Sequence, residues 1–207
     1  MKKDTLFITV LSLIFATSLF AQEGTITDLW TQVKAPVAVQ LTPVKIDPAV
    51  TALLILDIEE RTVTPRPRAG ASVPKIKKLM DWARSNNVLI AYSTTGAGNP
   101  ETIIPAVKPQ AGELVVKASV DKFFNTDLEK NLKDKKIQHL IITGTAAEGA
   151  VLGTSISACV RGFKVIIPVD GISSSELYAE QYVVWHMLNA PATKGNVVVT
   201  KSDMISK

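Results

Sequence analysis

The chain has 207 residues, with 23 Lys and Arg against 19 Asp and Glu, which gives a formal net charge of +4 at pH 7. Its basic and acidic residues are interleaved and form no aromatic-rich basic stripe, so nucleic acid is not an expected partner. The single cysteine, Cys159, excludes an intramolecular disulfide and is expected to be a buried, small apolar side chain.

The N-terminus has the pattern of a secretory signal peptide. Lys2 and Lys3 precede the apolar run from Leu6 to Phe20, and Ala21 supplies a small residue at which a signal peptidase can cut. The run is short for a membrane-spanning helix, which needs roughly 20 apolar residues. We expect residues 1–21 to be removed and the mature chain to be periplasmic or secreted, with no membrane association. An uncleaved anchor is the alternative.

After this segment, residues 22–50 form an N-terminal extension whose spaced prolines suit either a linker or a wrap around the core. Residues 51–207 alternate strand-like and helix-like segments and are expected to form one domain. Strands are predicted at 51–58, 87–93, 113–116, 137–143, 164–169 and 196–200. Helices are predicted from a Ser72 cap to about 83, from a Thr126 capping box to 135, and at 149–161 and 175–189. The alternation predicts a parallel sheet with helices on both faces.

In such sheets, ligands bind beyond the carboxyl ends of the strands. Asp57 lies at the end of the first predicted strand, Lys117 just after the third, and Asp170 after the fifth. Asp57 follows five residues without a polar side chain, so its carboxylate must find a partner or shift its pKa. The alternatives are structural: Asp57 can cap the following loop, and a lysine closing a strand is often only solvated.

A turn of very small residues follows the fourth predicted strand. Gly144, Thr145, Ala146 and Gly149 allow another group to approach the backbone, and the N–H groups of the following helix can face an anion or oxyanion. Ala150 carries only a methyl group at the middle of this turn. Any reaction there must take its reactive groups from elsewhere in the fold.

Three ordered motifs resemble the isochorismatase-like, or cysteine hydrolase, superfamily, over about Thr51 to Lys201. The first is the strand 51–58, which is similar to the family strand that ends in a catalytic aspartate. The second is similar to the family's lysine motif and consists of Lys117, Phe123, Thr126 and Leu128. The third has the spacing of the family's nucleophile segment and consists of Gly144, Val151, Thr154, Ala158 and Gly162.

The resemblance implies a three-layer α/β/α sandwich with a six-stranded parallel sheet, and a non-proline cis peptide between Thr145 and Ala146. It also implies that Asp57 and Lys117 are the catalytic residues. The family's cysteine nucleophile would stand at position 150, where this chain has Ala150. Thiolate chemistry is therefore excluded at that position.

Other candidate site residues are weaker. Arg61 and Phe123 are candidate substrate contacts, and Arg61, Arg66 or Arg68 can bind a substrate carboxylate unless they are simply solvated. The metal-binding relatives carry an Asp and His cluster after the second strand, whereas residues 94–105 here contain no histidine. We expect no metal and no cofactor.

These observations lead to an expected function. The isochorismatases proper, which the chain resembles in lacking the cysteine, split a vinyl ether without a covalent intermediate. We expect an exported, metal-independent hydrolase of a small molecule, with Asp57 as acid or base and Lys117 orienting the substrate. The alternative is a non-catalytic small-molecule-binding pseudoenzyme of the same fold. The apolar helix around Trp185 favours a homo-oligomer.

Overall fold

The computed structural model describes residues 24–207, and the predicted signal peptide, 1–21, lies outside these residues. The described chain forms two units, residues 24–35 and 36–207, and each is treated by itself. The first holds a short helix, α1 (Ile26–Leu29), followed by one 3₁₀ turn (Trp30–Gln32). Across residues 24–207, no helix combines the length and apolar character needed to cross a membrane.

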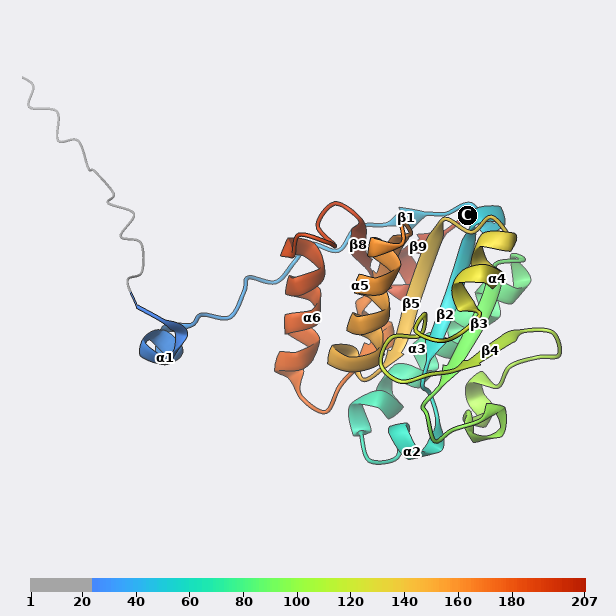
Figure 1. Ribbon diagram of the computed structural model, residues 1–207, viewed down its shortest axis with the longest axis horizontal. Coiled ribbons are helices and arrows are strands. Elements are labelled where there is room, and N and C mark those ends of the chain that lie inside the picture. The colour runs from blue at the N-terminus through green and yellow to red at the C-terminus, as the bar shows by residue number, and fades with distance from the viewer. Residues whose placement is uncertain (1–23) are drawn as a thin grey trace, which may run out of the picture. The chain divides into compact units, whose positions relative to one another are not determined.

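The second unit is built on a parallel sheet (Figure 1). In spatial order its strands are β4 (Leu114–Lys117), β3 (Leu89–Thr94), β2 (Thr51–Leu56), β5 (His139–Thr145), β6 (Lys164–Pro168) and β8 (Val197–Thr200). A two-residue strand, β7 (Ile172–Ser173), pairs with β5 beyond the end of β6. The predicted six-stranded parallel sheet is confirmed, and β7 extends it. A separate parallel pair joins β1 (Val44–Lys45) to β9 (Ile205–Ser206).

Helices cover both faces of the sheet. The helices are α2 (Glu60–Val63), α3 (Pro67–Ser85), α4 (Leu128–Asp134), α5 (Leu152–Val160) and α6 (Leu177–Asn189). Short 3₁₀ turns occur at Pro48–Val50, Pro100–Thr102, Pro105–Val107, Val169–Gly171 and Ser202–Met204, and a π-helical turn spans Ala147–Val151.

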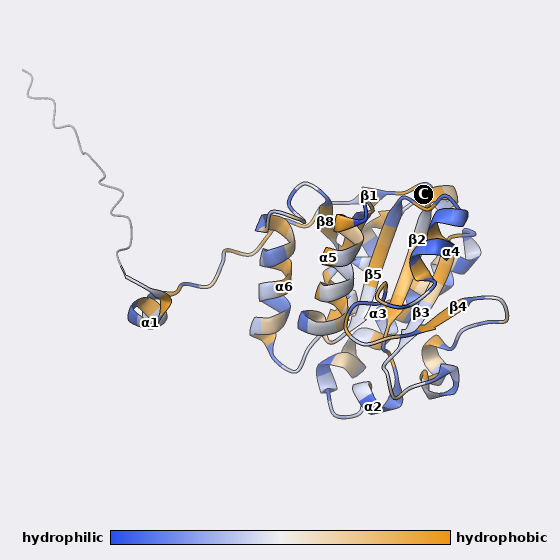
Figure 2. Cartoon of the chain, in the orientation of Figure 1, coloured by the Kyte–Doolittle hydropathy of each residue, from blue (hydrophilic) through white to orange (hydrophobic). Residues whose placement is uncertain are grey.

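Two apolar cores lie between these layers. Along β2, Leu53 and Ile55 pack in the core under α3, whereas Leu54 and Leu56 pack in the core under α4, α5 and α6. This alternation follows from the two-residue period of a strand, and because both faces are covered, every β2 residue is buried. Figure 2 shows apolar strands inside and hydrophilic residues along the outer sides of the helices. The three-layer α/β/α sandwich is therefore confirmed.

Two predicted helix starts are wrong. Helix α3 begins at Pro67, where proline's fixed φ suits the first helical position, so Ser72 lies inside it and donates to the Ala69 carbonyl at 2.9 Å. Helix α4 begins at Leu128, after Asp127, and the predicted capping box does not form. Thr126 still accepts the Leu128 N–H at 3.3 Å, and it donates its hydroxyl to the Lys122 carbonyl at 2.6 Å, which ties the start of α4 to the preceding loop.

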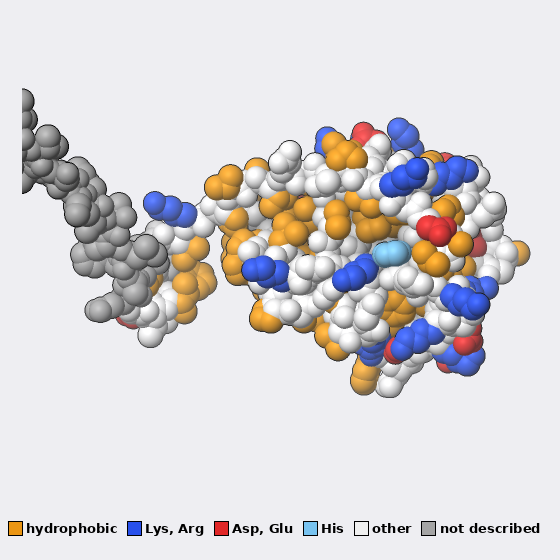
Figure 3. Space-filling view, turned by 90° about the horizontal axis from the view of Figure 1, so that it is seen from above, with side chains coloured by type: hydrophobic (Ala, Val, Ile, Leu, Met, Phe, Trp, Pro, Cys, Tyr) orange, Lys and Arg blue, Asp and Glu red, His pale blue; other side chains and the backbone are white. Residues whose placement is uncertain are grey.

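Part of the predicted extension packs on the domain. Through β1, residues 44 and 45 pair with 205 and 206, and Ile46 is buried in the core under α3. The extension was expected to be either a linker or a wrap around the core, and residues 44–46 follow the second alternative. On the face of the second unit seen in Figure 3, Lys and Arg side chains are scattered among apolar and neutral ones. The absence of a nucleic-acid partner stays a prediction.

Candidate active site

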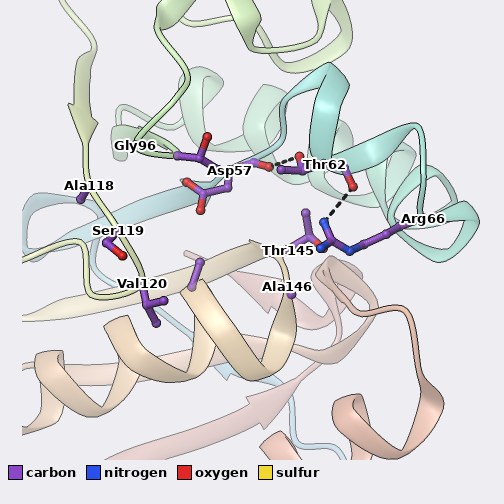
Figure 4. Close-up of a pocket in the computed structure, with 11 residues that line it drawn as sticks. Asp57, Thr62, Arg66, Gly96, Ala118, Ser119, Val120, Thr145 and Ala146 are labelled. Atoms are coloured by element: carbon purple, nitrogen blue, oxygen red, sulfur yellow. Dashed lines mark hydrogen bonds between the residues drawn. The ribbon is translucent and has the colours of Figure 1, made fainter.

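A cavity of about 240 Å³ opens where β2, β3, β4 and β5 end (Figure 4). This is the edge of a parallel sheet at which ligands are expected. Its walls come from the ends of these strands and from the segments that follow them. The lining residues are Asp57, Thr62, Arg66, Thr95, Gly96, Ala118, Ser119, Val120, Thr145, Ala146 and Ala150.

Asp57 is the acidic residue of this cavity, and its carboxyl group is fixed on both sides. Its side chain accepts hydrogen bonds from the Ser93 hydroxyl at Oδ1 (2.6 Å) and from the Lys122 ammonium at Oδ2 (2.7 Å). Its backbone has a φ of 54°, in the left-handed region, and Thr62 donates its hydroxyl to the Asp57 carbonyl at 2.5 Å. The carboxyl therefore points into the pocket from a defined position.

The pKa of Asp57 lies above its ordinary range. Burial is the largest cause, because it disfavours the charged carboxylate, and it outweighs the lowering by the Lys122 ammonium and the Ser93 hydroxyl. The negative charge of Glu59 raises the pKa further. Asp57 can therefore hold a proton at a higher pH than an exposed aspartate can.

The cation beside Asp57 is Lys122, whereas the sequence pattern predicts Lys117. Lys117 ends β4 with an exposed side chain, because Val116 takes the buried side of the strand. The chain then turns through 118–122 and brings Lys122 back to the sheet edge, where it is 0% exposed. Its ammonium also donates to the Ser119 carbonyl (2.5 Å) and the Ala118 carbonyl (3.4 Å). The expected Asp57–Lys117 pair is thus replaced by Asp57–Lys122.

The small-residue turn lies opposite Asp57. The predicted cis peptide between Thr145 and Ala146 is confirmed. Thr145, Ala146 and Ala150 line the cavity, and Ala150 is 5% exposed. Gly149 is not among the lining residues, and its N–H donates to the Ala146 carbonyl at 3.1 Å, so it serves the turn itself. An oxyanion role for this turn stays a prediction.

Gly144 sets the spacing between the turn and Asp57. It pairs with Leu56, the residue before Asp57, and has a φ of 130°. A Cβ atom on Gly144 would lie 2.1 Å from the Leu56 carbonyl oxygen, so only glycine fits this approach.

The three arginines of the loop after Asp57 have different surroundings. Arg66 lines the cavity, and its Nη1 donates to the Thr62 carbonyl at 3.1 Å. Arg61 is exposed and lines a neighbouring groove that also contains Glu60 and Glu101. Arg68 forms an ion pair with Glu180 of α6. Only Arg66, of these three, is in the pocket.

Phe123 is not in the cavity. Its ring is buried and stacks on Phe163 with 5.9 Å between the centroids, under the guanidinium of Arg161. Asp170 also lies away from the pocket lining, because its carboxylate accepts from the Ser202 N–H (2.8 Å) and hydroxyl (2.7 Å). Both residues therefore have structural surroundings, and Asp170 does not join Asp57 in one crevice.

Glu59 is a buried acidic residue beside the cavity that the sequence patterns do not single out. It is 0% exposed and accepts from the Thr95 N–H (2.7 Å) and the Thr102 hydroxyl (2.6 Å). The loop lies so close that a Cβ on Gly98 would be 1.8 Å from Glu59 Oε1. Glu59 thereby fixes the loop that presents Thr95 and Gly96 to the cavity.

Cys159 is buried, as predicted, and burial raises the pKa of its thiol to about 11. The described part of the chain contains no group of three or more His, Cys, Asp or Glu side chains arranged to hold a metal ion. The residues present therefore do not fit a metal centre of that composition, and no chemical step is assigned to one.

Together, the fold and the site define a three-layer α/β/α protein with a cavity beside a buried aspartate–lysine pair. Residues 51–203 match the Isochorismatase domain. The chain therefore belongs to the isochorismatase family.

Individual relatives are distant. YwoC, an uncharacterized isochorismatase family protein of Bacillus subtilis (strain 168), is 27% identical over 148 residues, which cover 60% of this chain and 78% of the relative. N-carbamoylsarcosine amidase of Arthrobacter sp. is 27% identical over 158 residues, which cover 63% of this chain but only 59% of the amidase. The crystal structure of a cysteine hydrolase from Pseudomonas syringae pv. phaseolicola 1448A superposes with a TM-score of 0.68 at 20% identity, covering 81% of this chain and 95% of that one. At this identity the likeness shows the shared fold.

Proposed function

We propose that the chain is a hydrolase of a small molecule that works in this cavity without a covalent thiol intermediate and without a metal. Membership of the isochorismatase family and the likeness to an amidase support hydrolysis. The observation that carries the proposal is Asp57, buried in the pocket between Ser93 and Lys122 with a raised pKa. Ala150, at the place where we expect the family's cysteine, offers no thiol nucleophile, and proton transfer by Asp57 needs none.

In this proposal Asp57 is the proton donor. A protonated Asp57 gives its proton to the substrate, such as the terminal carbon of a vinyl ether, and leaves an oxocarbenium ion. Water adds to this cation and returns a proton to Asp57, and the hemiketal collapses to a carbonyl compound and an alcohol. Lys122 touches Asp57 rather than the cavity, so we assign it the role of holding the carboxyl in place and stabilising its charged form.

The pH dependence of turnover distinguishes this role from that of a base. If Asp57 is the acid, kcat falls as pH rises through its pKa, because the proton is lost. If Asp57 is a base that activates water for attack on an amide or ester, kcat rises over the same range. We expect the falling limb, measured as kcat against pH on the mature chain. A rate that only rises with pH would rule out the acid role.

The function is tested by screening the mature chain against vinyl ethers, amides and esters, with Asp57→Asn beside it. Loss of proton transfer is expected to lower kcat by about 10²- to 10⁴-fold. Asp170→Asn is a matched control, because Asp170 also follows a sheet strand but lies outside the cavity. Turnover unaffected by Asp57→Asn would refute the mechanism.

A non-catalytic binding protein is the second candidate. It is favoured by Ala150 at the nucleophile's place and by the engagement of both Asp57 oxygens with protein donors. Binding of small molecules with no turnover of any substrate class would support it.

We also propose that the protein is exported to the periplasm or secreted, and that it forms a homo-oligomer. Export rests on the sequence of residues 1–21. Self-association is supported by Leu177, Tyr178 and Trp185, which lie exposed along α6.

A further inference from the structure

Arg66 lines the cavity, but the proposed proton transfer from Asp57 assigns it no role. Of the five arginines in the sequence, Arg68, Arg84 and Arg161 each pair with a glutamate. Arg66 forms no such pair within residues 24–207, although it is half-buried in the cavity wall. An unpaired guanidinium in a confined pocket is suited to an anionic ligand.

The backbone holds Arg66 in this place. It is the last residue before α3, and its N–H donates to the Val63 carbonyl at 3.0 Å. One terminal nitrogen donates to the Thr62 carbonyl, which leaves other N–H groups of the guanidinium free to bind a ligand. Figure 4 shows this guanidinium beside Thr145, whereas Asp57 and Ser119 lie farther along the pocket.

The two ends of the cavity therefore differ in charge and role. Asp57 stands at one end, with its own cation, Lys122, enclosed behind it. Arg66 stands at the other end, next to the turn at Thr145 and Ala146. At about 240 Å³, the cavity is smaller than the roughly 300–1,000 Å³ typical of sites for drug-sized ligands. A small ligand can thus reach both ends at once.

We propose that the substrate is a small carboxylate, bound through its carboxylate group by Arg66 so that its scissile bond lies at Asp57. This inference rests on the proposed function for the reaction but not for the binding. The planar guanidinium suits a carboxylate, because two N–H groups can donate in parallel to two oxygens. Arg66 is a specificity-determining residue in this assignment.

Binding is tested apart from turnover. Butyrate and its neutral isostere 2-pentanone are titrated into the mature chain by calorimetry. We expect butyrate to bind about tenfold to a hundredfold more tightly, the range expected of a hydrogen bond to a charged group. Arg66→Gln should abolish this preference, and Arg66→Lys should retain part of it, because the charge stays while the fork geometry is lost. Arg61→Gln, in the neighbouring groove, is the matched control and should leave the preference unchanged.

Turnover is tested with two pairs in which a methyl group replaces the carboxylate: 4-(vinyloxy)butanoate against butyl vinyl ether, and succinamate against butyramide. The carboxylate member of the reactive pair should have a kcat/KM about tenfold to a hundredfold higher. Arg66→Gln should remove this advantage mainly through KM, with kcat less affected.

The outcomes separate the two proposals. Preference for butyrate without turnover of any probe supports the anion site and overturns the hydrolase. Equal turnover of charged and neutral probes supports the hydrolase and overturns the anion site. A butyrate preference that survives in folded Arg66→Gln and Arg66→Lys, or that is lost in Arg61→Gln, also overturns the assignment to Arg66.

Discussion

Lys122→Met is expected to lower the free energy of unfolding by about 3–5 kcal/mol, because it removes one partner of a buried ion pair and leaves the other. Lys122 is fully enclosed and its ammonium contacts Asp57 at 2.7 Å. Methionine fills a similar volume but cannot donate to the carboxylate or to the carbonyls of Ala118 and Ser119. The measurement is urea denaturation at pH 7, monitored by circular dichroism.

Lys117→Met is the matched control, because the same substitution occurs five residues earlier on an exposed side chain. It should change stability by no more than about 0.5 kcal/mol. The double variant Asp57→Asn with Lys122→Met should recover part of the loss, since no unpaired buried charge remains. Equal losses for the two lysines would contradict the assignment of Lys122 as the partner of Asp57.

The loss should also depend on pH. Without Lys122, the main group that lowers the pKa of Asp57 is gone, so its pKa in the folded state rises farther above the unfolded value. The contribution of Asp57 to the free energy of unfolding is then fully present below the unfolded pKa. It is lost as pH rises through the folded pKa. The Lys122→Met variant should therefore come closest to the unmodified protein in acid, and the gap should widen toward neutral pH.

Gly144→Ala is expected to cost about 3 kcal/mol or more of stability, from overpacking together with a backbone conformation that disfavours a side chain. The added Cβ would lie 2.1 Å from the Leu56 carbonyl oxygen and 2.8 Å from the Leu56 Cβ. Because Leu56 precedes Asp57, relief of the clash would move β2 and β5 apart where the site is built. Denaturation midpoints and turnover are both measured, and both should fall.

Gly162→Ala separates the two causes. Gly162 has a φ of 88°, but a Cβ there meets nothing within 4 Å. Its substitution should cost only about 1–2 kcal/mol, from the left-handed backbone, and should leave turnover unchanged. If Gly144→Ala lowers stability no more than Gly162→Ala does, the clash with Leu56 does not contribute to the loss.

Much of the fold follows from local pattern. The β2 residues are apolar throughout because both faces of the strand are covered, and that run is visible in the sequence as TALLIL. The same pattern locates Asp57, since a charge directly after a buried strand must lie at a sheet edge. The family resemblance located the turn at Thr145 and Ala146.

The lysine was misassigned for a physical reason. Spacing within a motif fixes positions along the chain, whereas the partner of a buried carboxylate is fixed by position in space. The turn at 118–122 returns toward the sheet and brings Lys122, rather than the motif's Lys117, to Asp57. The local sequence around Lys122 does not mark it as buried, and its enclosure is visible only in the fold. A lysine at an enclosed position needs a countercharge, and Asp57 is the one available.

The places of Arg66 and Glu59 in the site could not be predicted from the sequence, for related reasons. Three arginines in one loop are equivalent by composition, and only the start of α3 at Pro67 decides which of them faces the cavity. Glu59 acts through the loop from 95 to 102, more than thirty residues away in sequence. Its partners are a backbone N–H and a hydroxyl, which leave no pattern that a single sequence displays.

The burial of Lys122 also determines how the protein reacts with amine-selective reagents. Acylation requires a neutral amine that a reagent can touch, and Lys117 meets that condition of access whereas Lys122 does not. Lys122 becomes reactive only in molecules that unfold, locally or globally, enough to expose its ammonium. Acylated Lys122 carries no charge, so it cannot form the ion pair with Asp57 again. The rate of labelling at this amine therefore reports how often Lys122 becomes exposed.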